Sequence, residues 1–485
     1  MWFWLLLVVA AVTASELLLR LPWWAQLNVM RGSARKSFRI LRSARISDHW
    51  KERVLPAYAG AMARASIWFF VLLCLVLFPV IALGLVFPDG LSAWTSALMR
   101  PWSIVALCAA SLGWIGWRRK DRSAASATGA EDYSALDRVL HRLALGSPAI
   151  AGMTHDIERA VFLGRATEPQ GGPVFVTGLA RAGTTILMRE LHATGQFGSL
   201  TYADMPFVLA PNLWARLSSR GRVAGEKRER AHGDGIEVDT QSPEALDEVY
   251  WRIFDGAAYI QPEGLVPHVP DEDLIAGYRD LMRLVLLRSG KRRYLSKNNN
   301  MVLRLRTLAA AMPDARFLVP LRDPLQHAQS LLAQHIRFQA SDSFTRDYMT
   351  WLGHHEFGAT HLPMLLGPDV SDKQPAHPAQ GPQTLDYWLR VWISVHLYLE
   401  DIAATAANVI LVPQDRLARD PAVWRRLAAE MAVEAGDIQE IRPLIPRPVE
   451  GFDPALVSEA RAIFHRLQTQ AEQRLGLTAQ VAGET

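Results

Sequence analysis

The hydrophobic residues of this chain are concentrated in long runs near its start and in shorter runs after that. Residues 66–87 carry no charge and are long enough to cross a bilayer as a helix of roughly 20 residues. Residues 102–117 form a second uncharged run, whose flanking tryptophans suit a membrane interface. Residues 1–24 are apolar apart from Glu16 and Arg20, which can pair on one helix face. We predict membrane spans at 66–87 and 102–117, and either a further span or a membrane-surface helix at 1–24.

Basic residues predict how these runs are oriented. Segment 31–64 contains nine lysine and arginine residues against Asp48 and Glu52, and more basic residues follow at 118–122. Because positive residues stay on the cytoplasmic side, 66–117 is predicted to be a hairpin, with the rest of the chain in the cytosol. Anionic lipid headgroups explain the basic segment more simply than nucleic acid does, so we expect a bilayer partner and no nucleic acid. We therefore predict an integral protein of a bacterial inner membrane with a cytoplasmic catalytic domain.

Composition refines this division only slightly. The chain has 485 residues and a formal net charge of +4, most of it in the basic flanks. Both of its two cysteines lie inside the apolar runs, so the sequence indicates no disulfide framework and no thiolate metal site. We expect a membrane region at 1–125, a linker and packing helix at 126–170, with the helix itself over 135–165, and a catalytic domain at 171–475.

A different pattern begins in the second third of the chain. The run 173–187 predicts a short buried strand, a loop bounded by Gly178 and Gly183, and the start of a helix over 184–194. This arrangement binds anions because glycines allow close backbone approach and the first N–H groups of the helix are free. The spacing is that of a P-loop in which the usual lysine is replaced, and the cation, Arg181, lies inside the loop.

A second motif lies far along the chain. Residues 315–321 are predicted to be a strand that runs into Arg322-Asp323-Pro324 and then into a helix carrying Ser330. An arginine fork and a hydroxyl can converge on one phosphate, and proline favours the first position of a helix. With a further strand at 294–299 and a strand and loop at 409–417, the pattern predicts an α/β fold. We expect a P-loop-like doubly wound parallel sheet, with ligands at its carboxyl edge, preceded by an N-terminal helical transmembrane region.

The two motifs together resemble those of sulfotransferases that use 3′-phosphoadenosine 5′-phosphosulfate (PAPS). The resemblance covers about residues 170–420. It implies PAPS as the donor and no metal, with Arg181 stabilising the departing phosphate. It also implies that Lys297 lies near the donor sulfate or the acceptor, where fixed donors stabilise charge on the sulfuryl oxygens. It assigns the 5′-phosphosulfate and then the 3′-phosphate to Gly178, Arg181, Ala182, Gly183, Thr184 and Thr185, and to Arg322 and Ser330.

Three residues are candidates for the base that takes the acceptor's proton. Asp204 stands where the resembling sulfotransferases carry an acidic residue after the loop, although an aspartate in this position also suits a cap or turn. His232 and Glu248 are second choices, and for both the competing interpretation is a solvated or capping side chain. The helix that carries Glu248 is expected to begin at Ser242-Pro243 and to border the acceptor pocket.

Residues 351–361 bring together three histidines and Glu356. Their spacing differs from the His-Glu-x-x-His helix of zinc enzymes. We therefore interpret this segment as an acceptor-recognition insertion rather than a metal site, with the following proline- and glycine-rich stretch, 367–381, as a lid.

The predicted reaction is sulfuryl transfer from PAPS to a hydroxyl of an unidentified acceptor. The membrane hairpin favours a lipid or a lipid-linked glycan in that role. Two alternatives stay open: a membrane-anchored P-loop kinase, and a membrane scaffold whose nucleotide fold has no catalytic activity. Magnesium-dependent use of ATP would favour the kinase. Binding of adenosine 3′,5′-bisphosphate without any modified acceptor would favour the scaffold.

Overall fold

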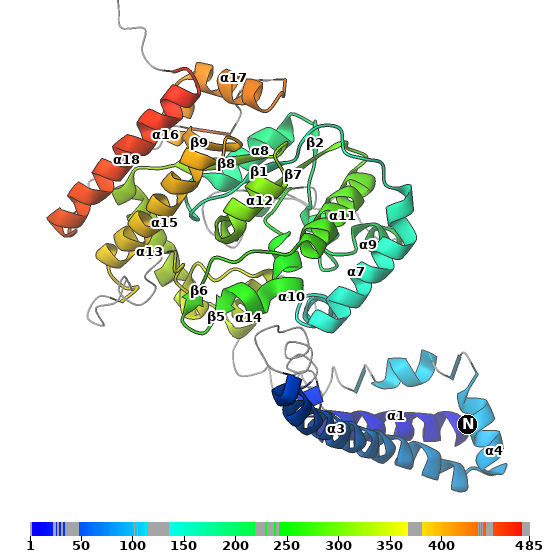
Figure 1. Ribbon diagram of the computed structural model, residues 1–485. Coiled ribbons are helices and arrows are strands. Elements are labelled where there is room, and N and C mark those ends of the chain that lie inside the picture. Colours follow the sequence, from blue (N-terminus) through cyan, green and yellow to red (C-terminus); the bar gives the residue numbers. More distant parts are fainter. Residues whose placement is uncertain are drawn as a thin grey trace, which may run out of the picture. The chain divides into compact units, whose positions relative to one another are not determined.

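The chain folds as two compact units, Met1–Ala127 and Thr128–Thr485, in a computed structural model (Figure 1). The structure describes residues 2–22, 48–100, 135–218, 242–366, 381–434 and 450–477, with short stretches at 26, 29–30, 33, 102–103, 105–111, 113–114, 228–229, 237–238, 436, 438 and 440–442. His232, most of the predicted lid and part of 102–117 lie outside the described residues.

The first unit consists of apolar helices in the part that is described. They are α1 (Trp2–Arg20), α3 (Asp48–Ala82), the 3₁₀ turn η1 (Leu83–Leu85) and α4 (Gly90–Leu98). Trp94 of α4 is fully buried in a cluster with Leu6 and Ala10 of α1. The charged pair expected in α1 is present, because Arg20 Nε donates to Glu16 Oε2 over 2.9 Å.

One described helix, Pro56–Leu85, is long and apolar enough to cross a bilayer, and Phe3–Leu18 is apolar but shorter. Helix α3 begins before the predicted span, so the end of the basic segment is helical and continuous with it. The turn after α3 depends on Gly84, since a Cβ there would lie 2.6 Å from side-chain atoms of Leu91 and Trp94. The segment between the two predicted spans, 88–101, therefore contains a helix, α4, packed back on that turn.

The second unit is built on a five-stranded parallel sheet, shown at the centre of that unit in Figure 1. Its order is β2-β7-β1-β8-β9, with bounds β2 (Phe197–Gly198), β7 (Arg293–Lys297), β1 (Val174–Val176), β8 (Arg316–Leu321) and β9 (Val409–Pro413). The doubly wound parallel sheet expected from the sequence is confirmed. Its strands are short apolar runs because helices cover both faces and no polar face is needed.

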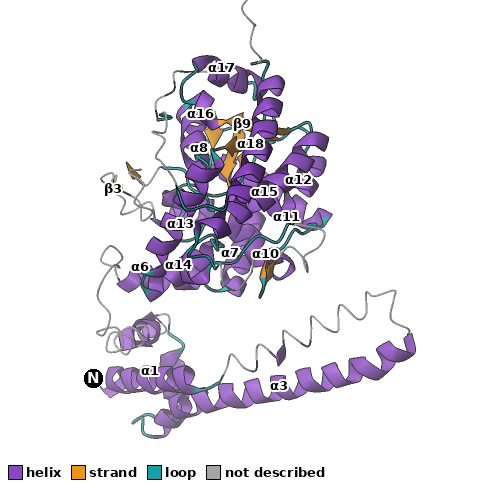
Figure 2. Cartoon of the chain, turned by 90° about the vertical axis from the view of Figure 1, so that its left-hand side faces the viewer, coloured by secondary structure: helices purple, strands orange, loops and turns teal. Residues whose placement is uncertain are grey.

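The helices described in this unit surround the strands, which Figure 2 shows in orange. They are α6 (Ala135–Ala144), α7 (Pro148–Phe162), α8 (Thr184–Ala193), α9 (Pro211–Ser218), α10 (Glu248–Tyr259), α11 (Glu272–Ser289), α12 (Leu305–Ala311), α13 (Pro324–Gln339), α14 (Ser343–Leu352), α15 (Leu385–Thr405), α16 (Gln414–Leu417), α17 (Pro421–Glu430) and α18 (Pro454–Arg474). Short 3₁₀ turns are η2 (Leu163–Arg165), η3 (Tyr202–Asp204), η4 (Asn299–Arg304) and η5 (Gly358–Thr360), and two small hairpins pair β3 (Arg228–Glu229) with β4 (Glu237–Val238) and β5 (Ile260–Gln261) with β6 (Gly264–Leu265).

Side chains alternate between two cores on the faces of the sheet. Phe175 and Phe317 point to the larger core and stack with ring centroids 5.0 Å apart. Val174 and Val176 point to the smaller core, which α8 and α17 cover. Each such side chain contributes about 1.5–3 kcal/mol on burial, so the sheet is held from both sides.

Two predicted helices differ from the structure, each for a local reason. The helix expected over 135–165 is broken into α6 and α7, because Ser147 caps a new helix whose first residue is Pro148. The helix expected from Ser242 begins instead at Glu248. The residues before it pair with the chain that follows β2. Pro243 forms a bridge with Thr201, and the Leu200 carbonyl oxygen accepts a hydrogen bond from the Glu244 N–H.

The strand order fixes where a ligand would lie. Strand β1 leads through α8 to β2 on one side, whereas its neighbour β8 leads to β9 on the other side. Adjacent strands with diverging connections create a switch point, and ligands of such sheets bind beyond the carboxyl ends of those strands. The residues that follow β1 and β8 are those of the two predicted phosphate motifs.

Candidate functional site

The loop between β1 and α8 has the conformation of an anion-binding turn. Gly178 and Gly183 have φ values of 121° and 98°, and Gly183 is the N-cap of α8. A Cβ at Gly183 would lie 3.0 Å from the Gln414 side chain, so glycine is needed there for conformation and for space. Arg181 also has a positive φ, 72°, which is rare for a residue with a side chain. Ala182 between them is buried.

The second predicted motif clamps this loop. Arg322 Nη1 donates to the Arg181 carbonyl oxygen over 2.8 Å, and Arg181 Nε donates to Ser330 Oγ over 3.2 Å. Asp323 caps α13 by accepting from the N–H groups at the start of the helix, where Pro324 holds the first position. The structure therefore brings together Arg181, Arg322 and Ser330, which the sequence predicted to act on one nucleotide.

A third residue of the same helix holds the loop. The ring Nε2 of His327 lies 2.7 Å from the Ala180 carbonyl oxygen, and the histidine is fully buried. Burial, followed by the charge of Arg322, lowers the pKa of His327 well below its usual value. The ring is therefore neutral, and its proton lies on Nε2, where a carbonyl oxygen accepts it. Sequence reasoning missed this residue, although it stands inside the second motif.

The two arginines of the site repel each other. Burial, followed by the neighbouring charge of Arg181, lowers the pKa of Arg322, while Asp415 and Asp323 act in the opposite direction. Among the described residues, Arg322 Nε is buried and has no hydrogen-bond partner. An anion can accept from a buried guanidinium N–H that has no protein partner, so these residues fit a phosphate group.

The start of α8 connects to the end of β7 through Asn299. Thr184 Oγ1 donates to Asn299 Oδ1 over 3.4 Å, and both Thr184 and Thr185 are buried. Lys297, the last residue of β7, lies on the same edge of the sheet. Its Nζ is 3.8 Å from Glu244 Oε1, and Tyr202 donates from its hydroxyl to the other oxygen of Glu244.

Asp204 makes the contacts of a cap. Its Oδ2 accepts hydrogen bonds from the N–H and the hydroxyl of Thr201 over 2.9 and 3.1 Å, and its Oδ1 lies 3.5 Å from Arg288 Nε. These contacts close the turn η3 at the end of β2. The role of Asp204 as a base stays a prediction.

Glu248 is part of a fully buried ion pair. Arg304 donates to both of its carboxylate oxygens over 2.9 and 3.1 Å, and Tyr259 and Asn298 donate to it as well. This network ties α10 to the residue that follows β7, and removing one partner would leave a buried charge unpaired. A role of Glu248 as base also stays a prediction, and His232 lies outside the described residues.

The segment 353–361 lies against the same edge. Asn299 Nδ2 donates to Glu356 Oε1 over 3.0 Å, and Asn300 Nδ2 donates to the Gly353 carbonyl oxygen over 2.8 Å. Glu356 also faces His354, whose Nδ1 is 3.6 Å from Oε2. Within the described part of the chain, no group of three or more histidine, cysteine or acidic residues is arranged to hold a metal ion.

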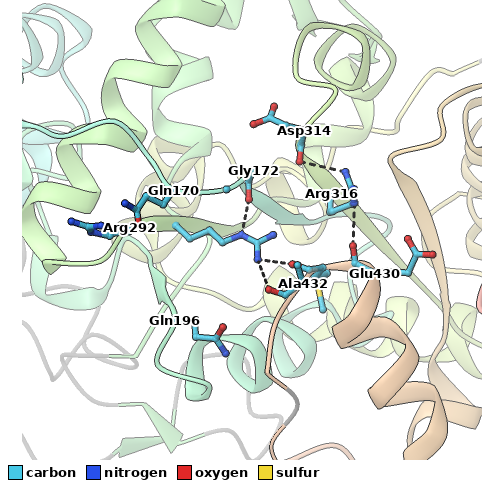
Figure 3. A pocket seen from close by; sticks show the side chains of 11 residues that line it. Gln170, Gly172, Gln196, Arg292, Asp314, Arg316, Glu430 and Ala432 are labelled. Atoms are coloured by element: carbon cyan, nitrogen blue, oxygen red, sulfur yellow. Dashed lines mark hydrogen bonds between the residues drawn. The ribbon is translucent and has the colours of Figure 1, made fainter.

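A cavity of about 400 Å³ opens at the opposite end of the sheet, next to the first residues of β7 and β8 (Figure 3). Arg293 and Arg316 line it, and their guanidinium groups are bonded to backbone carbonyl oxygens. Arg293 Nε donates to Gly172 O over 2.8 Å, and Arg316 Nε donates to Glu430 O over 3.3 Å. This cavity is therefore distant from both phosphate motifs, and its arginines serve the packing of α17.

One family model matches part of the second unit. A sequence model described as the Sulfotransferase family matches residues 173–362, which include the glycine loop, the motif with Arg322 and Ser330, and the segment 353–361. No curated protein matches the chain.

Solved structures were found at low similarity. Sulfotransferase STF1 from Mycobacterium tuberculosis is 15% identical, with 72% of this chain and 88% of that chain covered and a TM-score of 0.38. A sulfotransferase from Alicyclobacillus acidocaldarius is 17% identical, with 64% and 98% covered and a TM-score of 0.30. The family model matches the part of the second unit that builds the site: residues 173–362 are similar to the sulfotransferase family.

Proposed function

We propose that this protein transfers the sulfuryl group of PAPS to a hydroxyl of a membrane-associated acceptor, a lipid or a lipid-linked glycan. The observation that carries the proposal is the meeting of Arg322 and Ser330 with Arg181 on the glycine loop. Two cationic groups from motifs far apart in the sequence suit a donor that carries phosphate on both sides of its ribose.

In this proposal the loop and the start of α8 hold the 5′-phosphosulfate. Its amide groups and Arg181 stabilise the charge that develops on the bridging oxygen as the sulfur–oxygen bond breaks. Arg322 and Ser330 bind the 3′-phosphate, and the unpaired Nε of Arg322 supplies a donor for it. Lys297 stabilises charge on the sulfuryl oxygens from the neighbouring strand.

Membrane attachment is the second part of the proposal. The helix Pro56–Leu85 would anchor the protein, and the basic segments on both sides of the apolar region would keep the catalytic unit on the cytosolic face. A donor made in the cytosol and an acceptor in the bilayer then meet at one surface.

The direct test uses the full-length protein in detergent or lipid nanodiscs. Transfer of labelled sulfate from PAPS to a lipid and glycan extract is expected for the wild type and lost in R181A and R322A. Adenosine 3′,5′-bisphosphate should bind the wild type without magnesium. Transfer of phosphate from ATP, with no bisphosphate binding, would replace this proposal by a kinase. Undiminished sulfate transfer in both arginine variants would overturn the residue assignment.

A further inference from the structure

A histidine and a glutamate of segment 353–361 are held beside the start of α8 without being used by the proposed donor site. Asn299 links them to the loop, because its oxygen accepts from Thr184 and its amide nitrogen donates to Glu356. The side chain of Asn299 alone therefore connects the first residue of α8 with Glu356. This is the end of α8 at which the sulfuryl group of the donor would lie.

The segment is fixed in this place by close backbone contacts. Gly353 has a φ of 81°, and a Cβ there would lie 2.6 Å from Glu248 Cγ, so the chain approaches the buried ion pair as closely as glycine allows. Asn300 holds the carbonyl oxygen of the same residue. His354 follows directly, and its own N–H donates to the Met349 carbonyl oxygen of α14 over 2.9 Å.

Glu356 is an ionised carboxylate in a nearly closed environment. Its side chain is 8% exposed. Burial by itself would raise the pKa of Glu356, but its interactions with His354 and Asn299 lower it well below its usual value. A carboxylate of this kind orients a neighbouring imidazole and stabilises the imidazolium that forms when the ring takes a proton.

One ring nitrogen of His354 faces the carboxylate of Glu356, and the other is available to the hydroxyl of an acceptor substrate. Nδ1 is the atom that faces Glu356, and the side chain is 15% exposed. Among the described residues, no hydrogen bond to Nε2 is found. The ring is therefore supported on one side and reachable by solvent on the other.

We propose that His354 is the base of the transfer reaction, with Glu356 and Asn299 as positioning residues. This inference rests on the function proposed above. As the acceptor oxygen attacks sulfur, His354 Nε2 takes the hydroxyl proton and a new oxygen–sulfur bond forms. The bond between sulfur and the bridging oxygen breaks, and its electron pair stays on the phosphate of adenosine 3′,5′-bisphosphate.

The other acidic residues near this edge are less suited to the task. Asp204 accepts the hydrogen bonds of a turn, and Glu248 is surrounded by Arg304, Asn298 and Tyr259. Glu244 is paired with Lys297. His354 combines a supporting carboxylate with an accessible nitrogen, which is the arrangement that general base catalysis requires.

The test measures donor turnover, as labelled sulfate released to water or transferred to a lipid and glycan extract, in the full-length protein. H354Q is expected to lower kcat by about 100-fold or more, the usual contribution of a general base, with unchanged affinity for adenosine 3′,5′-bisphosphate. Added imidazole should restore turnover in H354G. E356Q, which keeps an acceptor for Asn299 but loses the charge, should lower kcat by a smaller factor. H465Q, at an exposed histidine of α18, is the matched control and should behave as wild type.

The outcomes separate the two proposals. A wild-type protein that binds the bisphosphate but shows no donor turnover overturns the proposed function itself. An active wild type with an equally active H354Q overturns only the assignment of His354. The same holds if H354Q is inactive but imidazole fails to restore H354G, since the histidine would then be structural. Loss of turnover in D204N, with H354Q active, would return the role to Asp204.

Discussion

Two pairs of arginines lie at opposite ends of one sheet and differ in what their donors contact. At the amino end, burial and then the charge of Arg316 lower the pKa of Arg293, much as burial and then Arg181 lower that of Arg322 at the carboxyl end. The amino-end guanidinium groups are occupied by the carbonyl oxygens of Gly172 and of residues at the end of α17, whereas Arg322 keeps a buried N–H without a described partner. Two adjacent arginines therefore form an anion site only where some of their N–H groups have no partner in the protein.

The largest effect expected from this comparison is on ligand affinity at the carboxyl end. R322A removes charge-assisted hydrogen bonds worth about 3 kcal/mol, so the affinity for adenosine 3′,5′-bisphosphate should fall about 100-fold. Calorimetric titration of the purified protein measures this change. R292A, at an exposed arginine of the amino-end cavity, is the control. Equal losses in the two variants would show that the sheet ends do not differ and that charge alone attracts the ligand.

For Arg293 we expect a loss of stability and no loss of ligand affinity. R293A leaves the carbonyl oxygens of Gly172 and Met431 without their donor, so the free energy of unfolding should fall by about 2 kcal/mol. Urea unfolding followed by circular dichroism gives this value, and bisphosphate affinity of the folded protein should not change. A variant that stays as stable as wild type but binds the bisphosphate more weakly would place an anion site at the amino end.

This difference between the two ends also explains what could be predicted from the sequence. The carboxyl-end loop is specified by neighbours along the chain, since Gly178, Gly183 and the Asp323-Pro324 cap each act within a few residues. Such local patterns are visible without a structure. The break inside the predicted helical stretch 135–165 is equally local, because Ser147 and Pro148 begin a new helix there.

Other features depend on partners that are distant in the chain. Asn299 contacts Glu356, and Glu244 faces Lys297, across segments whose pairing is fixed only by the sheet order. The role of Arg293 likewise requires the end of α17 beside β7. No spacing within one segment encodes these contacts, so the glycine loop and the helix cap were predictable and these long-range contacts were not.

A further expected effect is on the acid stability of the core beneath the loop. Burial lowers the pKa of His396 to about 4, and its ring lies 6.2 Å from that of His327, which holds the loop. Below a pH of about 6.5 the unfolded chain binds a proton that the folded histidine does not, so stability decreases as pH falls toward 4. H396Q should flatten this dependence by up to about 1.4 kcal/mol per pH unit. Unfolding free energies measured in steps between pH 7.5 and 4.5 in buffers of constant ionic strength test this. An unchanged slope would mean that His396 is protonated in the folded protein.

The smallest effect expected is at Ser330, whose hydroxyl oxygen accepts from Arg181 Nε over 3.2 Å. S330A removes one neutral partner from a charged donor, a change of about 1 kcal/mol, so bisphosphate affinity should fall about 5-fold. S330T keeps the hydroxyl and should bind nearly as wild type.

The double variant S330A with R322A decides how the carboxyl end works. If the hydroxyl and Arg322 bind the same phosphate, the double variant should lose less affinity than the two single losses multiplied together. Strict multiplication would mean that Ser330 acts only by holding Arg181, independently of the phosphate bound by Arg322.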